Sequence, residues 1–122
     1  MLRDVVVADT DADAMALWAD GPLFGFASWF RPFGFDRGLP HPETGEVPDF
    51  LEEGLALVGS VDTVTRQLER LFDRLPVRWI FAWEWNGLIP HRPLMRSIEL
   101  FATEVAPRVG GLEAPGMVGA PT

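Results

Sequence analysis

Three short apolar runs, each followed by a segment with helical periodicity, set the main limit on how this chain can fold. The runs are residues 5–8, 55–58 and 77–83, and their β-branched and aromatic residues are typical of strands in a parallel sheet covered on both faces. Alternation of such strands with helices favours βαβ units with right-handed crossovers. A closed (β/α)8 barrel needs eight strands and about 250 residues. A chain of 122 residues is too short to close such a barrel alone. We therefore expect an α/β fold with about three βα units and one core.

Helix start signals follow the first two strand candidates. Thr10 can accept the amide hydrogen of Asp13 as the N-cap of a helix over residues 12–18. Ser60 can cap a second helix directly after the second run. The apolar stripe of that second helix consists of Val61, Val64, Leu68, Leu71 and Phe72. Its spacing follows the 3.6-residue period of a helix with one buried face.

The third strand candidate leads through the turn residues 84–87 into a last helix. Pro93 suits the first turn of this helix, and Pro107 ends it. The predicted buried stripe consists of Leu94, Ile98, Phe101 and Val105, widened by Met95 and Ala102. Residues 112–122 contain two Pro and two Gly and are expected to form a disordered tail.

Residues 21–48 break every regular period, because they contain five Pro and five Gly. The aromatic residues of this loop are Phe24, Phe26, Trp29, Phe30, Phe33 and Phe35. Such a segment is too apolar for a solvated linker, and long loops in compact domains commonly serve as lids or binding loops. Two interpretations stay open: an irregular segment pinned to the core by its aromatic side chains, or an apolar wall over a ligand pocket.

Charge and cysteine content exclude several classes of function. Ten Arg against eighteen Asp and Glu give a net charge of −8, the wrong sign for binding nucleic acid or an anionic membrane surface. No apolar run approaches the ~20 residues of a membrane span. The absence of Cys removes thiolate chemistry and, with no signal peptide, points to the cytoplasm. His41 and His91 are isolated in the sequence, so no metal site is expected.

Three blocks of the sequence together carry a family resemblance. The blocks are residues 5–14; residues 57–60 with 62–64 and 67–68; and residues 86–107. In this order they resemble the C-terminal end of the luciferase-like flavin-dependent monooxygenases. The resemblance covers about residues 3–108. The sequence departs from the family pattern in the aromatic loop and at Val61, where the family usually has Pro.

The resemblance implies a fold, a cofactor and a chemistry. The family fold is a (β/α)8 TIM barrel, of which residues 1–111 would supply the last three βα units as a partial barrel. The cofactor is usually reduced FMN, with deazaflavin in some relatives, and the chemistry is oxygen activation to oxidise a small apolar organic substrate. The earlier strands, which provide much of the flavin phosphate site in the family, have no counterpart in this sequence.

Two places at predicted strand ends are candidate cofactor-binding sites. Ser60 follows Gly59 at a helix start, where free amides favour phosphate; the alternative is that Ser60 is an ordinary N-cap. Trp83, Glu84 and Asn86 follow the strand that would be the eighth of a complete barrel. Trp83 or Trp85 could stack on a flavin or substrate ring while Glu84 or Asn86 hydrogen-bonds a polar edge. The alternative is an aromatic core position with solvated polar neighbours.

Trp29, Phe30 and Trp85 are the candidate lining of a substrate pocket. The aromatic loop precedes the seventh strand, taken as adjacent to the eighth, and its 28 residues can reach over the strand ends. No catalytic acid or base follows from the sequence. Unclosed strand edges lead us to expect a homo-oligomer or a partner chain that completes the barrel. Two functions stay open: a flavin-dependent monooxygenase unit, and a non-catalytic barrel remnant acting as an oligomerisation or interaction module.

Overall fold

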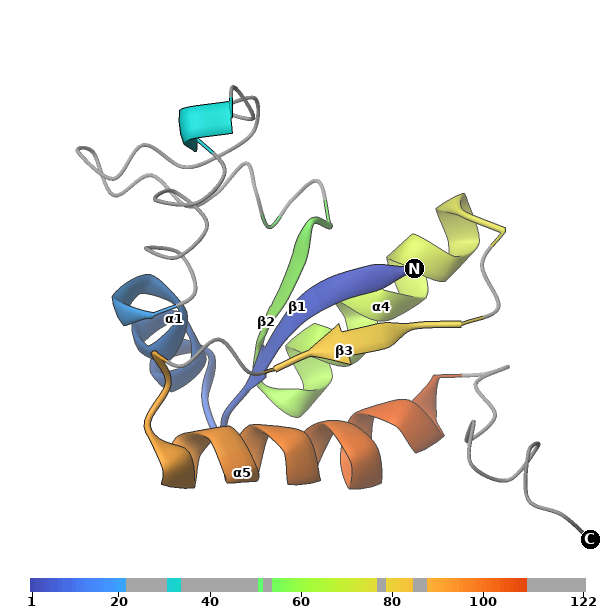
Figure 1. Ribbon diagram of the computed structural model, residues 1–122. Helices are drawn as coiled ribbons and strands as arrows, with labels where there is room; N and C mark the ends of the chain where they lie inside the picture. The colour runs from blue at the N-terminus through green and yellow to red at the C-terminus, as the bar shows by residue number, and fades with distance from the viewer. Residues whose placement is uncertain (22–30, 34–50, 52–53, 77–78, 85–87, 110–122) are drawn as a thin grey trace, which may run out of the picture.

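The computed structural model describes residues 1–21, 31–33, 51, 54–76, 79–84 and 88–109. Three strands alternate with helices along these residues (Figure 1). The elements are β1 (Leu2–Val7), α1 (Asp11–Asp20), η1 (Arg31–Phe33), β2 (Ala56–Gly59), α4 (Val61–Arg74), β3 (Phe81–Trp83), α5 (His91–Leu100), η2 (Phe101–Val105) and η3 (Ala106–Arg108). The predicted α/β class is confirmed.

The strands form one parallel sheet in the order β2-β1-β3. β1 pairs with β2 from Asp4 to Val7, and with β3 from Leu2 to Asp4. β1 is therefore the central strand, and the consecutive strands β2 and β3 lie at opposite edges. The expectation that these two strands are adjacent, as in a consecutively wound barrel, is wrong for the described sheet. Parallel pairing itself is confirmed.

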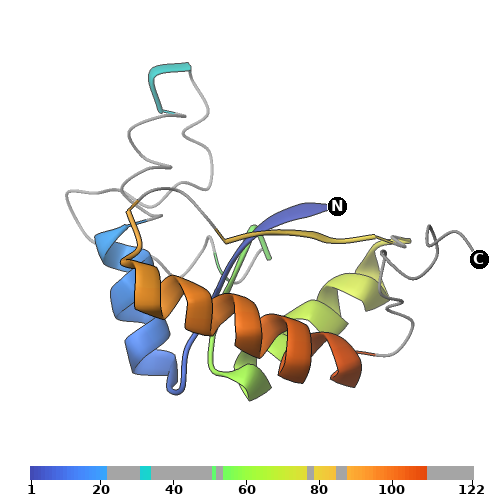
Figure 2. The ribbon, with the colours of Figure 1, turned by 60° about the horizontal axis from the view of Figure 1, so that its bottom comes forward.

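This strand order puts helices on both faces of the sheet. The connection from β1 to β2 and the connection from β2 to β3 run in opposite directions across the sheet. Right-handed crossovers then place α1 and α4 on opposite faces. Both views show α1 and α4 on opposite sides of β1 and β2 (Figures 1 and 2).

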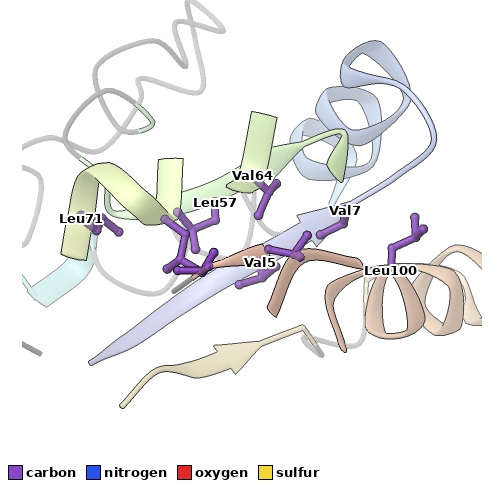
Figure 3. Close-up of a cluster of buried hydrophobic side chains, with 9 residues drawn as sticks. Val5, Val7, Leu57, Val64, Leu71 and Leu100 are labelled. Carbon is purple, nitrogen blue, oxygen red and sulfur yellow. The ribbon is translucent and has the colours of Figure 1, made fainter. Parts of the chain in front are cut away.

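Successive residues of β1 enter two separate cores. Val5 and Val7 pack on the α4 side (Figure 3). That cluster consists of Val5, Val7, Leu57, Val64, Leu68, Leu71, Leu100, Val105 and Val109. Val6 packs on the other side, in a cluster that includes Ala14 and Trp18 of α1. Because adjacent side chains of a strand point to opposite faces, an unbroken run of valines suits a strand covered on both faces.

The predicted caps and the α4 stripe are confirmed. The Thr10 side chain accepts the Asp13 amide at 3.1 Å and begins α1. The Ser60 side chain accepts the Thr63 amide at 3.4 Å and begins α4. The buried apolar face of α4 is formed by Val64, Leu68 and Leu71, with Val61 and Phe72 packed at its margin.

The buried face of the last helix differs from the predicted stripe. Ser97, Leu100 and Val105 are buried, whereas Ile98, Met95 and Ala102 are exposed and Phe101 is half-buried. Part of the difference arises because residues 101–105 form a π-helical turn, in which the Ala106 amide donates to the carbonyl five residues earlier. This wider turn moves the apolar face out of the 3.6-residue period, so that Leu100 and Val105 enter the same cluster.

β3 is shorter and more exposed than the run at residues 77–83 predicts. It contains three residues, and Phe81 and Trp83 are 68% and 51% exposed. As an edge strand it pairs with β1 on one side. Trp83 is therefore not a core residue, which removes one alternative left open by the sequence.

The two edge strands differ in how their outer backbone groups are covered. The Val58 amide of β2 donates to Gln67 Oε1 at 3.0 Å, and Gln67 Nε2 donates to the Val58 carbonyl at 3.3 Å. α4 thus covers the edge of the strand that precedes it. No corresponding side-chain bond to the outer edge of β3 occurs in the part of the chain that the structure describes.

Several predicted features concern residues that the structure does not describe. Trp29, Phe30, His41, Trp85, Asn86 and residues 112–122 lie outside the described residues. Phe33, in η1, is 76% exposed and so does not pin the aromatic loop to the core. The described helices include none with the length and hydrophobicity of a bilayer span. Among the described side chains, no cluster of three or more His, Cys, Asp or Glu could hold a metal ion.

Candidate functional site

The strand order marks the carboxyl ends of β1 and β3 as a candidate site. In open α/β sheets, ligands bind outside the strand ends where neighbouring strands send their connections in opposite directions. β1 leads to α1 on one face. β3 leads first to Ile89 and Leu94, which pack in the same cluster as α1, and α5 then ends with Leu100 in the cluster on the other face. α5 therefore passes from one face to the other beside the end of β1, where Ser97 bonds Val7. We call this place the β1–β3 switch point, and define it by Val7, Trp83, Glu84 and Ser97.

At the switch point, a side chain of α5 takes the place of β3 beside β1. The β1–β3 ladder ends at the pair Asp4 and Trp83, before β1 itself ends. The Val7 amide donates instead to Ser97 Oγ at 2.9 Å. Ser97 Oγ in turn donates to Glu84 Oε1 at 2.6 Å. Ser97 is buried, with 1% of its surface exposed. Its hydroxyl therefore joins β1, α5 and the end of β3.

Glu84 is a half-buried carboxyl that titrates in the neutral range. Burial raises the pKa of Glu84 from 4.5 to about 7, and the hydrogen bond from Ser97 opposes this rise. Near pH 7 both protonation states are populated, so Glu84 can either donate or accept a hydrogen bond there. Titratable groups of this kind are suited to acid–base chemistry or to orienting a polar ligand.

Trp83 lies opposite a second carboxyl on the sheet. Asp4 and Trp83 are direct partners in the β1–β3 register, so their side chains share one face. Burial raises the pKa of Asp4 to about 7, and no hydrogen bond or ion pair of its carboxyl occurs within the described residues. The half-exposed indole is thus open to a planar ligand beside a carboxyl that is neutral below pH 7.

The helix start at Ser60 is already filled by the chain's own groups. The Ser60 amide donates to Asp11 Oδ1 at 2.7 Å, and this bond contributes most to the lowered pKa of Asp11. The Ser60 side chain caps α4 at Thr63. Gly59 has φ +155, and a Cβ there would lie 2.6 Å from the Thr63 side chain. Ser60 is therefore an ordinary N-cap, and a phosphate here would have to displace the Asp11 carboxylate.

Of the predicted cofactor residues, Trp83 and Glu84 are consecutive at the end of β3, where Trp83 pairs with Asp4 and Glu84 bonds Ser97, and Ser60 lies on the loop after β2. Sequence reasoning missed Ser97, and it also missed Arg96, which bridges α5 to Asp9 at 3.0 Å. The signal for Ser97 is weak: it is three residues after Leu94 and three before Leu100, on a helical face, but as a polar residue it does not extend an apolar stripe.

The sequence and the fold of this chain are similar to those of known monooxygenases. No protein-family model matches the sequence. Two Pseudomonas putida enzymes are similar: 3,6-diketocamphane 1,6-monooxygenase is 31% identical over 86% of this chain, and 2,5-diketocamphane 1,2-monooxygenase 1 is 29% identical over 88%. The solved oxygenating constituent of 3,6-diketocamphane monooxygenase, a type II Baeyer–Villiger monooxygenase in complex with FMN, matches 88% of the chain with a TM-score of 0.66 and 28% identity. The chain is a homologue of luciferase-like flavin-dependent monooxygenases.

The homology confirms the resemblance carried by the three sequence blocks. The match covers only part of each relative, because the chain spans about a third of their length, from 30% to 33%. The relative of known structure is a TIM-barrel enzyme, whereas the described sheet of this chain has three strands.

Proposed function

We propose that this chain is the flavin-binding, carboxyl-terminal portion of an FMN-dependent monooxygenase barrel, with residues 1–111 forming that portion. The observation that carries the proposal is the fold similarity to an FMN-bound monooxygenase over 88% of the chain. By analogy with the relatives' names, the co-substrates would be oxygen and a small apolar organic compound. The cysteine-free sequence supports a cytoplasmic location.

The groups at the β1–β3 switch point support flavin binding there. The ring is planar with a polar edge that both donates and accepts hydrogen bonds, and Trp83 offers a half-exposed indole for stacking. Glu84 follows it with a carboxyl that can donate or accept near pH 7. Bound reduced flavin would supply the electrons for oxygen activation; a deazaflavin would present a similar ring. Asn86 remains a candidate cofactor-binding residue, and Trp29, Phe30 and Trp85 remain the candidate lining of the substrate pocket.

The phosphate of FMN would be held mainly outside this chain. Asp11 occupies the amide of Ser60, and the net charge of −8 opposes a second anion. Completion of the barrel would add strands at an open edge, and β3 offers one while Gln67 covers β2 at Val58. A different partner chain that pairs with β3 would meet both needs, whereas a second copy would cover the β3 edge but would bring the same negative charge and the same filled Ser60 amide.

Flavin titration tests the proposal. We expect FMN to bind the purified chain in the micromolar range, and Trp83→Ala to weaken binding at least about tenfold. Phe81→Ala is the matched control, because Phe81 is a more exposed aromatic residue of the same strand. Flavin fluorescence reports binding, and oxygen consumption with an added flavin reductase reports activity. Absence of binding at high micromolar FMN would favour the interaction module instead.

A further inference from the structure

We propose that Ser97 is a positioning residue that fixes one oxygen of Glu84, so that the other oxygen is presented to a flavin at the β1–β3 switch point. The identity of the ligand rests on the proposed function. The geometry rests on the hydrogen bonds that Ser97 makes to Val7 and Glu84.

The Ser97 hydroxyl has only one hydrogen, and its environment determines where that hydrogen goes. The Val7 amide must donate, so Ser97 Oγ accepts from it at 2.9 Å. The hydroxyl hydrogen is then directed to Glu84 Oε1, 2.6 Å away. Glu84 Oε2 has no hydrogen-bond partner within the described residues. Because Glu84 is only half-buried, a ligand can reach this second oxygen.

The protonation of Glu84 decides what it offers to the ligand. With Oε1 accepting from Ser97, an added proton resides on Oε2, which then donates a hydrogen bond; the ionised form accepts one instead. Stacking of a ring on Trp83 would further desolvate the carboxyl and favour its neutral form. We therefore expect flavin to bind more tightly at pH 6 than at pH 8.

Other charged groups near Glu84 do not account for its behaviour. The charged or titratable groups on β1, the turn after it and α5 are Arg3, Asp4, Asp9, His91, Arg92, Arg96 and Glu99. The Arg96 guanidinium, next to Ser97 in the sequence, is directed to Asp9 at 3.0 Å and Glu99 at 3.4 Å. The pKa of Glu84 is instead raised by burial and lowered by the Ser97 hydroxyl.

A titration without flavin tests the positioning role directly. Carbon-13 NMR of the Glu side-chain carboxyls follows Glu84, which Glu84→Gln identifies by loss of one resonance. Ser97→Ala removes the bond that favours the ionised form, so the Glu84 midpoint should shift upward from the wild-type value, and Ser97→Thr should restore it. If Ser97→Ala fails to fold, Ser97→Cys, with its weaker donor, should give a smaller upward shift. A wild-type midpoint near the ordinary Glu value, or one unmoved by these variants, would overturn the proposal.

Flavin binding then tests the role toward the ligand. Riboflavin is the probe, because it lacks the phosphate whose own ionisation near pH 6 would confuse the pH profile. Affinity should fall at least about threefold from pH 6 to pH 8 in the wild type, and Glu84→Gln should remove this dependence. An unchanged profile in Glu84→Gln would overturn presentation of Glu84 to the ligand while leaving flavin binding intact. If no flavin binds but the Glu84 midpoint moves as expected, positioning by Ser97 is supported and the proposed function fails.

Discussion

The two sides of β1 differ in how the backbone groups at the strand ends find hydrogen-bond partners. On the β2 side, backbone groups at the strand end are satisfied by local partners: Asp11 takes the Ser60 amide and Gln67 covers both backbone groups of Val58. On the β3 side, the ladder stops early, and Ser97 supplies the missing bond from a helix 90 residues further along the chain than Val7. On the β2 side these backbone groups are thereby paired within the chain, whereas the β3 side leaves one carboxyl oxygen and a half-exposed indole available.

The difference between the two sides indicates which polar groups stabilise the fold and which remain available to a ligand. Polar groups that are fully paired within the fold stabilise it and leave nothing for a ligand. Glu84 has one paired oxygen, and Trp83 is half-exposed, so each has a surface still to be covered. Such incompletely satisfied positions are candidates for function, provided that the part of the molecule around them is rigid.

The largest expected effect is loss of packing on the β2 side. Leu68 is fully buried on α4, and Leu68→Ala should reduce the free energy of unfolding by about 2–5 kcal/mol. Phe101→Ala is the comparison on the α5 side, and it should cost less than Leu68→Ala because Phe101 is only half-buried beside the π-helical turn. Urea unfolding measures both changes. Equal losses would contradict this assignment of the buried faces.

Ser97→Ala comes next, and it removes the hydroxyl that joins the end of β1 to Glu84 after the β1–β3 ladder has ended. It leaves the Val7 amide buried without its acceptor, which should cost about 1–3 kcal/mol. Thr103→Ala is the matched control, since Thr103 donates a hydroxyl hydrogen bond to the Glu99 carbonyl at an exposed position and should change stability little. A similar small change for both variants would show that the switch point is not held by Ser97.

The β2 side was largely predictable from sequence because its signals are local. The Thr10 and Ser60 caps act over three residues, and the α4 stripe recurs within one helix. The valines of β1 predicted a strand covered on both faces without any knowledge of the covering helices. Short-range rules are sufficient where the stabilising contacts are themselves short-range or non-specific.

The β3 side was less predictable because its contacts are distant in sequence. The position of β3 beside β1 joins residues about 80 apart, and local patterns do not specify which strands are neighbours. The π-helical turn changes the helical period that a stripe analysis assumes. Ser97 is buried through bonds to Val7 and Glu84, neither of which can be inferred from its immediate neighbours. Trp83 and Glu84 became candidates from the sequence alone because binding residues commonly follow the ends of parallel strands.

The pH dependence of stability sharpens the comparison further. The pKa of Glu84 is higher in the folded chain, about 7, than its ordinary value of 4.5. The folded state therefore binds this proton more tightly, so Glu84 contributes most below pH 4.5 and its contribution is lost as the pH rises to about 7. With allowance for solvent screening, this loss is roughly 1–2 kcal/mol. Asp4, also raised to about 7, acts in the same direction.

Denaturant unfolding at pH 5 and pH 8 measures this effect. The wild type should be less stable at pH 8, and Glu84→Gln should reduce the difference between the two pH values while Asp4 accounts for what remains. Asp11, whose pKa is lowered by the Ser60 amide, acts only at pH values below its ordinary range and does not affect the comparison. Greater wild-type stability at pH 8 would contradict burial as the cause of the Glu84 shift.

The smallest change in stability is expected for a substitution on the exposed edge strand β3. Such a substitution should instead change the association of the chain. Phe81 is 68% exposed on β3, so Phe81→Lys should alter the free energy of unfolding within about 0.5 kcal/mol. If a second copy pairs with β3, the charge should weaken that pairing, because lysine on an edge strand opposes edge-to-edge association.

Light scattering at high micromolar concentration should then show a mass above the monomer for the wild type and a lower mass for Phe81→Lys. The control Glu69→Lys, on the exposed face of α4, adds the same residue away from β3 and should leave the mass unchanged. A wild-type protein that is strictly monomeric at this concentration would count against association through the β3 edge.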